Sequence, residues 1–187
     1  MKSKKKNAAL LILCFSLSLA NAQHEIKPEK GYTPQIGLMV DMLEELKDRL
    51  MEDIRDLDQA ETDYLFDDKA NSIGAIIMHL VATESYFQVE TLEDRTWTDE
   101  EGEFWGIAGG LGAESRDKLK GKPIKYYLDL WDQVREKTLE GLKTKDDAWF
   151  EAGIDESMNN HWAWFHILEH QANHMGQIAM VKKRLPQ

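Results

Sequence analysis

The chain has 187 residues, with 34 Asp and Glu against 23 Lys and Arg, which gives a formal net charge of −11. Nucleic acid and anionic membranes are bound through basic surfaces, so this acidic balance disfavours both as partners. The single cysteine, Cys14, lies near the N-terminus. No cysteine follows Cys14, so residues 15–187 can form no disulfide bond, cysteine-ligated zinc site or thiol redox centre.

The N-terminal segment has the three parts of a secretory signal peptide. Basic residues in Met1–Lys6 precede the apolar run Ala8–Ala20, and Ala20-Asn21-Ala22 is an A-x-A cleavage site. The apolar run is shorter than the roughly 20 residues of a membrane span. An uncleaved anchor or a buried helix is the alternative. We expect residues 1–22 to be removed and residues 23–187 to be exported, to the periplasm or the medium, without membrane attachment.

Four amphipathic segments follow, each with apolar residues at the spacing that places them on one face of a helix. Their starts carry helix-initiating residues, either Pro at the first helical position or Ser or Asn as N-cap. The predicted helices run from Thr33-Pro34 to Ile54, from Asn71-Ser72 to Phe87, from Pro123 to Leu142, and from Asn159-Asn160 to Arg184. No stretch alternates convincingly with a period of two residues. The sequence therefore predicts an all-α fold, with helices of the usual bundle length.

The connection between the second and third predicted helices, residues 95–122, is unusually long. It contains three large aromatic residues and a glycine-rich run, namely Trp97, Phe104, Trp105 and Gly106–Gly112. The glycine spacing does not match a dinucleotide-binding fingerprint. A loop of this length inside a domain is usually functional or partly helical. It is interpreted either as a lid-like excursion that carries aromatic residues over one end of the bundle or as a packed insertion without a role.

The last predicted helix contains four of the six histidines, and His166, His170 and His174 are four residues apart. Side chains at i and i+4 share a face of a helix, whereas residues eight apart are separated by about 12 Å. Zinc holds imidazole nitrogens at roughly 2.0–2.1 Å, so His166 and His174 cannot readily share one ion. The helix therefore offers one usable pair, either His166/His170 or His170/His174.

A third ligand has to come from another helix, because a catalytic zinc typically has three protein ligands and an open position. The best candidate is His79, which lies among apolar residues in the middle of the second predicted helix. A lone histidine there would more often be a hydrogen-bonded core residue. Bundle interiors are, however, recurrent places for metal sites built from facing helices, and the histidines of the last helix favour that interpretation.

The other histidines and two glutamates are weaker candidates. His24 and His161 lie too close to the ends of their segments to reach the centre. Glu84 and Glu169 could ligate a metal or orient an imidazole. A surface position is nevertheless expected for both glutamates.

The pattern W-x-x-x-H-x-x-x-H-x-x-x-H-x-G-Q, from Trp162 to Gln177, together with the mid-helix His79, resembles the DinB-like superfamily. Helix order, the long connection and the length are also similar, so the resemblance covers nearly all of residues 23–187. It implies an up-down four-helix bundle, with a homodimer as its assembly. It also implies a divalent ion, zinc or nickel, bound by His79, His170 and His174 with water or substrate in an open position.

Two features depart from the resemblance. Many relatives have H-H-R-G-Q where this chain has Asn173-His174-Met175-Gly176-Gln177. The ligand position is kept, but the neighbouring His and Arg are replaced, so any contact they make with substrate or a partner subunit is open here. The relatives that transfer thiols also work in the cytoplasm, unlike a protein with a secretory leader.

Three functions are compatible with these residues. The first is a metal-dependent enzyme, a thiol transferase or a hydrolase acting on a small molecule, in which the ion activates a bound thiol or water. The candidate acid or base is His166 or Glu84. The second is a metal- or ligand-binding module without turnover, and the third is a structural bundle with buried histidines. We favour the enzyme, because a three-histidine site with an open position is typical of catalytic zinc.

Overall fold

The computed structural model describes residues 25–186, and the predicted signal peptide lies outside this range. The elements are α1 (Pro34–Ile54), α2 (Gln59–Thr62), α3 (Ile73–Phe87), the π-helix η1 (Gln88–Leu92), α4 (Asp99–Gly109), α5 (Ala113–Lys118), α6 (Ile124–Lys143), α7 (Asp147–Glu151) and α8 (Asn160–Lys182). Residues 25–186 contain no β-strand, only an isolated bridge between Gly153 and Asn159. The predicted all-α class is confirmed. None of the described helices is long and apolar enough to cross a membrane.

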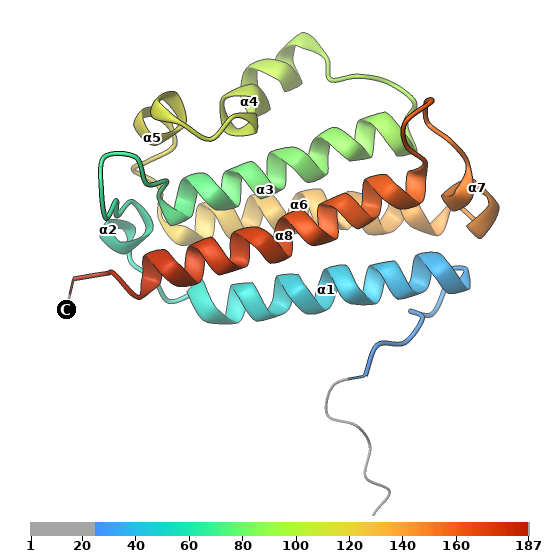
Figure 1. Ribbon diagram of the computed structural model, residues 1–187, viewed down its shortest axis with the longest axis horizontal. Coiled ribbons are helices and arrows are strands. Elements are labelled where there is room, and N and C mark those ends of the chain that lie inside the picture. Colours follow the sequence, from blue (N-terminus) through green and yellow to red (C-terminus); the bar gives the residue numbers. More distant parts are fainter. Residues whose placement is uncertain (1–24, 187) are drawn as a thin grey trace, which may run out of the picture.

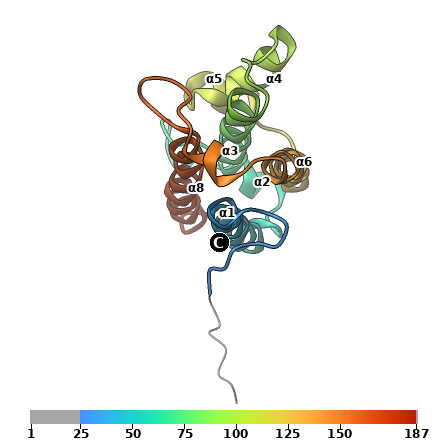
Figure 2. The same ribbon diagram turned by 90° about the vertical axis from the view of Figure 1, so that its right-hand side faces the viewer.

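The four long helices, α1, α3, α6 and α8, lie side by side (Figure 1). α3 contacts both α6 and α8, and α1 contacts the same two helices from the other side. In the view along the helices, α3 and α1 occupy opposite corners, and α4 and α5 lie beyond α3 (Figure 2). α3 is therefore covered on three sides, which explains why most of its residues are buried.

The long helices do not alternate in direction, so the expected up-down topology is wrong. α6 runs parallel to α3: Tyr127 packs against Gly74 near the start of both helices, and Thr138 accepts a hydrogen bond from Gln88 near their ends. The reason is the long connection, which carries the chain back along α3 to the end where that helix began (Figure 1). Crossover connections of this kind are how helical bundles depart from strict alternation.

The same connection is partly helical, as predicted, and packs along α3 instead of over one end of the bundle. A capping box between Thr98 and Glu101 starts α4. Trp105 and Ala108 are buried against the core cluster, whereas Phe104 is 46% exposed. Part of the segment is therefore packed against the core, whereas much of it is exposed, and Ala108 gives it a contact with the candidate site.

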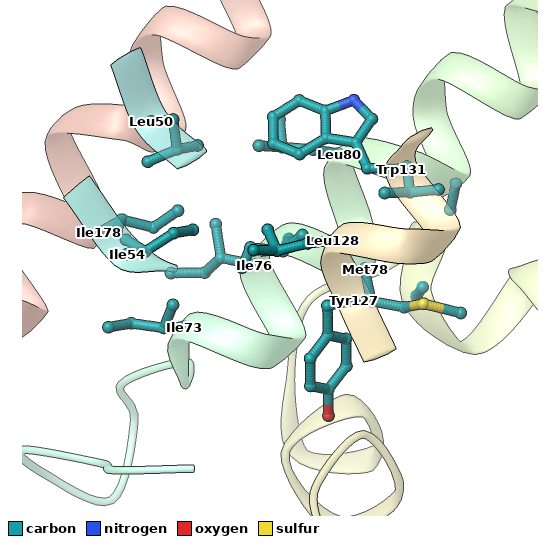
Figure 3. Packing of buried hydrophobic residues seen from close by; sticks show 14 of the residues in the cluster. Leu50, Ile54, Ile73, Ile76, Met78, Leu80, Tyr127, Leu128, Trp131 and Ile178 are labelled. Atoms are coloured by element: carbon teal, nitrogen blue, oxygen red, sulfur yellow. The ribbon is translucent and has the colours of Figure 1, made fainter. Parts of the chain in front are cut away.

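All four long helices contribute apolar side chains to the interior near α2 (Figure 3). Ile54 from α1, Ile76 from α3, Trp131 from α6 and Ile178 from α8 are each at most 2% exposed. Fully burying a large apolar side chain contributes about 1.5–3 kcal/mol. This packing fixes α3 against α8, the two helices that carry the histidines.

Candidate metal centre

Three histidines meet where α3 packs against α8. His79 lies in the middle of α3, and His170 and His174 are one turn apart on α8. The Nε2 atom of His170 is 3.0 Å from Nε2 of His79 and 3.0 Å from Nε2 of His174. One ligand atom from each residue lies within 4.8 Å of the others. Of the two pairs that spacing left open, His170/His174 is the one that meets His79.

Hydrogen bonds on the far side of two rings determine where their protons lie. Nδ1 of His79 is 2.8 Å from the carbonyl oxygen of Ala108, which can only accept, so Nδ1 carries the proton. Nδ1 of His174 is 3.1 Å from Oε1 of Gln177 and donates in the same way. In the neutral rings both Nε2 atoms are then bare acceptors. Residue identity at position 108 carried no signal of this contact, because the acceptor belongs to the main chain.

The central nitrogen cannot satisfy both of its neighbours. Neutral His170 has at most one proton on Nε2, yet this atom faces the bare Nε2 atoms of His79 and His174 at 3.0 Å each. At least one contact therefore places two lone pairs against each other. A cation between the three nitrogens would replace that repulsion with attraction.

The two separations at His170 suit one metal ion. Two nitrogens bound about 2.1 Å from the same ion lie roughly 3.0–3.4 Å apart when the angle at the ion is about 90–109°. The two 3.0 Å separations lie at the short end of this range. Three imidazoles with second hydrogen bonds on two of them are a donor set that suits zinc and nickel. Metal binding by these residues stays a prediction.

Burial keeps all three histidines neutral. Desolvation lowers the pKa of His170 to about 3, and the charges that the neighbouring histidines would carry act in the same direction. Desolvation also lowers the pKa of His79 and of His174, outweighing the opposite effect of the hydrogen bonds to their Nδ1 atoms. Metal ligation requires neutral imidazole, so near neutral pH the ligands are already in the required form.

His166 lies beside the triad without joining it. Its Nδ1 is 2.9 Å from Oε1 of Glu169, and its ring stacks between Trp162 and His170, with centroid separations of 5.1 and 5.6 Å. Because a carboxylate only accepts, Nδ1 of neutral His166 carries the proton and Nε2 is a free acceptor. His166 is therefore next to the three histidines that could hold an ion but is not one of them, and its role at the site stays a prediction.

Glu84 is not on the surface, contrary to expectation, but 1% exposed in a neighbouring polar cluster. Its two oxygens accept hydrogen bonds from Arg135 at 2.6 and 2.9 Å, from Thr138 at 2.7 Å and from Trp131 at 3.1 Å. Burial alone would raise the pKa of Glu84, but the charge and hydrogen bonds of these partners lower it. Glu84 thus has no lone pair free for a proton in transit.

Two further histidines were weaker candidates. His161 is exposed and stacks on Phe150, with ring centroids 4.3 Å apart, and His24 lies outside the described residues. Where many relatives have His and Arg, Asn173 is exposed and Met175 packs partly buried against the core.

An all-helical chain with histidines from two helices converging on one point belongs to the class that the DinB-like superfamily defines. Residues 38–187 match the family model described as Mycothiol-S-transferase, a family of this superfamily, and the chain belongs to it. The match covers most of the chain and includes all three histidines. The family is metal-dependent and of the thiol-transferase type. No curated protein matches the chain at a significant level.

Proposed function

We propose that this protein is a metal-dependent thiol transferase that holds one divalent ion, zinc or nickel, through Nε2 of His79, His170 and His174. The observation that supports this most strongly is the pair of 3.0 Å contacts at His170, one of which has no proton to share. A structural zinc site normally has four protein ligands. Among the described residues the cluster has three, which leaves one position for a small-molecule substrate. Family membership favours a thiol as the group transferred.

The ion, when bound, would lower the pKa of a thiol in the open position and so favour the thiolate. The protein's own residues would do the rest. The hydrogen bonds to Nδ1 hold the rings of His79 and His174 so that their Nε2 atoms converge. Nε2 of His166, left free because Glu169 holds Nδ1, would accept the thiol proton. The sulfur would then bond to an electrophilic carbon of the second substrate as the leaving group departs with its electron pair.

The proposal extends to architecture and location. Residues 23–187 would form a single four-helix bundle of DinB type, supported by the side-by-side packing of α1, α3, α6 and α8. Residues 1–22 would be a signal peptide, supported by their basic, apolar and A-x-A parts. The enzyme would then meet its thiol in the periplasm or outside the cell. N-terminal sequencing of the protein from an exporting host tests this: the mature chain should begin at Gln23, and a chain beginning at Met1 would contradict it.

Metal analysis and a turnover assay test the enzymatic proposal. Protein purified without chelator should carry about one divalent ion per chain, as expected for a single three-histidine centre. His170→Ala should lose the ion while keeping its helical circular dichroism, and His161→Ala, at an exposed histidine apart from the triad, should keep it. With a panel of low-molecular-weight thiols and an electrophilic aryl halide, only the metal-loaded wild type should turn over.

The outcomes separate the alternatives. A metal-free wild type with native helicity would contradict the metal centre itself. An ion that is bound and lost with His170→Ala, but without turnover of any thiol, would favour a binding module. Metal-dependent cleavage of an activated ester without thiol transfer would favour a hydrolase.

A further inference from the structure

A cavity of about 290 Å³ lies at the end of the bundle where α7 and the start of α8 meet η1, the turn that follows α3 (Figure 1). Its lining is Glu90, Thr91, Leu92, Asp94, Lys145, Trp149, Ala152, Gly153, Ile154 and Asn160. Glu90 follows His79 by eleven residues, which corresponds to about 16 Å along a helix. A small molecule in this cavity would therefore not touch an ion held by the three histidines, and the thiol-transfer proposal makes no use of the cavity.

Glu90 has a carboxylate oxygen that lacks a hydrogen-bond donor. Its Oε1 accepts the hydroxyl of Tyr86 at 3.0 Å, whereas its Oε2 is buried without a partner among the described residues. An ionised oxygen that is withdrawn from water and left unpaired is unfavourable, and such an exception needs an explanation. A donor bound in the cavity, met by a turn of the Glu90 side chain, would supply the missing partner.

Asn160 offers a second unpaired acceptor. It lines the cavity and is only 5% exposed. Its amide nitrogen donates to the carbonyl oxygens of Trp149 and Ala152, at 2.9 and 3.3 Å. These bonds hold the amide in place, while its oxygen receives no hydrogen bond from the part of the chain that the structure describes. The amide oxygen is thus a fixed acceptor at the cavity wall.

The cavity wall also contains two unusual backbone features. η1 is a π-helix of five residues, a rare turn that occurs frequently at functional sites. Asp94 has a φ of 52°, and within residues 25–186 no other residue except glycine has a positive φ. Residues held in this conformation cost energy and cluster at ligand sites. Both features shape the segment that brings the carboxylates of Glu90 and Asp94 to one cavity.

A cation lines the same cavity. Among the described residues the ammonium of Lys145 has a single hydrogen bond, to the carbonyl oxygen of Leu92 at 3.3 Å, and it lies 5.2 Å from the centre of the Trp149 ring. Two carboxylates in the lining disfavour an anion as the ligand, and the ammonium disfavours a metal ion. The charges of the lining favour a molecule that carries both signs.

We infer that the cavity binds a free α-amino acid with an apolar side chain. The ammonium of the amino acid has three donors for the oxygens of Glu90, Asp94 and Asn160, and its carboxylate would pair with Lys145. The apolar part of the lining would hold its side chain: Leu92, Trp149, Ala152 and Ile154. The volume of about 290 Å³ is just below the range of about 300–1,000 Å³ that is typical of small-molecule sites, which suits a ligand of this size.

Isothermal titration calorimetry of the full chain with L-leucine, L-methionine and L-phenylalanine tests the inference. At least one of them should bind, with one site per chain. Its analogues without the carboxylate or without the ammonium, which for leucine are isoamylamine and 4-methylpentanoate, should bind about tenfold or more weakly. Each analogue loses a contact between charged groups, and such contacts contribute at least this much affinity.

Two pairs of variants locate the site. Lys145→Met should weaken binding by about tenfold or more, whereas Lys137→Met, at an exposed lysine of α6, should bind like the wild type. Glu90→Gln should also weaken binding, and Glu100→Gln, at an exposed glutamate of α4, should not. Circular dichroism shows whether each variant keeps its helical content.

Three results would overturn the inference. They are the absence of binding of all three amino acids at millimolar concentrations, equal affinity for an amino acid and its analogue without the carboxylate, and equal affinity in Lys145→Met and Lys137→Met. Lys145→Met should keep the metal content and the turnover of the wild type, because the cavity is remote from the histidines. Failure here would therefore leave the proposed enzyme untouched, and an inactive enzyme would leave the titration valid.

Discussion

Two polar clusters lie between the packed helices, and only one of them, around Glu84, is complete in the pairing of its charged groups. Around Glu84 every carboxylate oxygen has donors and Arg135 pairs with two glutamates, so positive and negative groups compensate each other. Around His170 three nitrogens face one another without enough protons. Buried polar groups are normally satisfied, and an exception needs an explanation. The comparison suggests that the first cluster stabilises the fold, and it supports the proposal that the second cluster holds a ligand.

The largest effect should come from breaking the complete cluster. Arg135→Met leaves Glu84 buried without its counter-charge, and removing one partner of a buried ion pair costs about 3–5 kcal/mol. Urea unfolding measures the loss. Arg55→Met, at an exposed arginine, should stay within about 0.5 kcal/mol of wild type, and Glu84→Leu/Arg135→Met should recover part of the loss. If Arg135→Met resembles Arg55→Met, the cluster does not stabilise the fold.

A smaller effect should follow from weakening the incomplete cluster. Gln177→Leu removes the acceptor that holds Nδ1 of His174. Loss of such a partner typically lowers metal affinity by about 10–100-fold. Competitive titration with a chelating dye measures this change, with Gln133→Leu on the exposed face of α6 as the control. Equal affinity in both variants would show that Gln177 does not orient the ligand.

A third difference should appear in the acid sensitivity of the metal-free protein. The pKa of His170 is about 3 in the folded chain against 6.5 unfolded, so the unfolded chain binds more protons and stability falls as pH drops from 6.5 towards 3. The pKa of Glu84 is lowered from 4.5, so its contribution is present above 4.5 and is lost below it. Urea midpoints over a pH series measure this. The His170→Ala variant should lose much of the fall in stability that begins below pH 6.5 and should keep the fall that begins below pH 4.5. If the fall in stability below pH 6.5 is unchanged in His170→Ala, His170 is not its source.

The helices and the histidines could be predicted because their signals are local. Apolar periodicity and capping residues such as Ser72, whose hydroxyl accepts from the amide of Ala75 at 3.2 Å, mark the helices within a few residues. The four-residue spacing places His170 and His174 on one face. His79 followed from its apolar setting and the family resemblance, since nothing in its own segment points to α8.

The rest depends on contacts between distant residues. Glu84 stands between Thr83 and Ser85, which suggests a surface position, and its partner Arg135 is 51 residues away. α3 and α6 are parallel because of the path that the long connection takes. The periodicity of apolar residues contains no information about that path. The short helices η1 and α7 have five residues each, which is too few to show a periodic pattern of apolar residues.

The hydrogen bond from His79 to Ala108 has a consequence for how this family can be compared. The acceptor is a main-chain oxygen in α4, so many residues small enough for a position with 0% exposure could present it. A substitution at position 108 can therefore keep the hydrogen bond, and the identity of the residue there does not show whether the bond is present. Insertions or deletions between residues 95 and 122 would shift the oxygen away from the ring. In this segment, length should be preserved more strictly than composition.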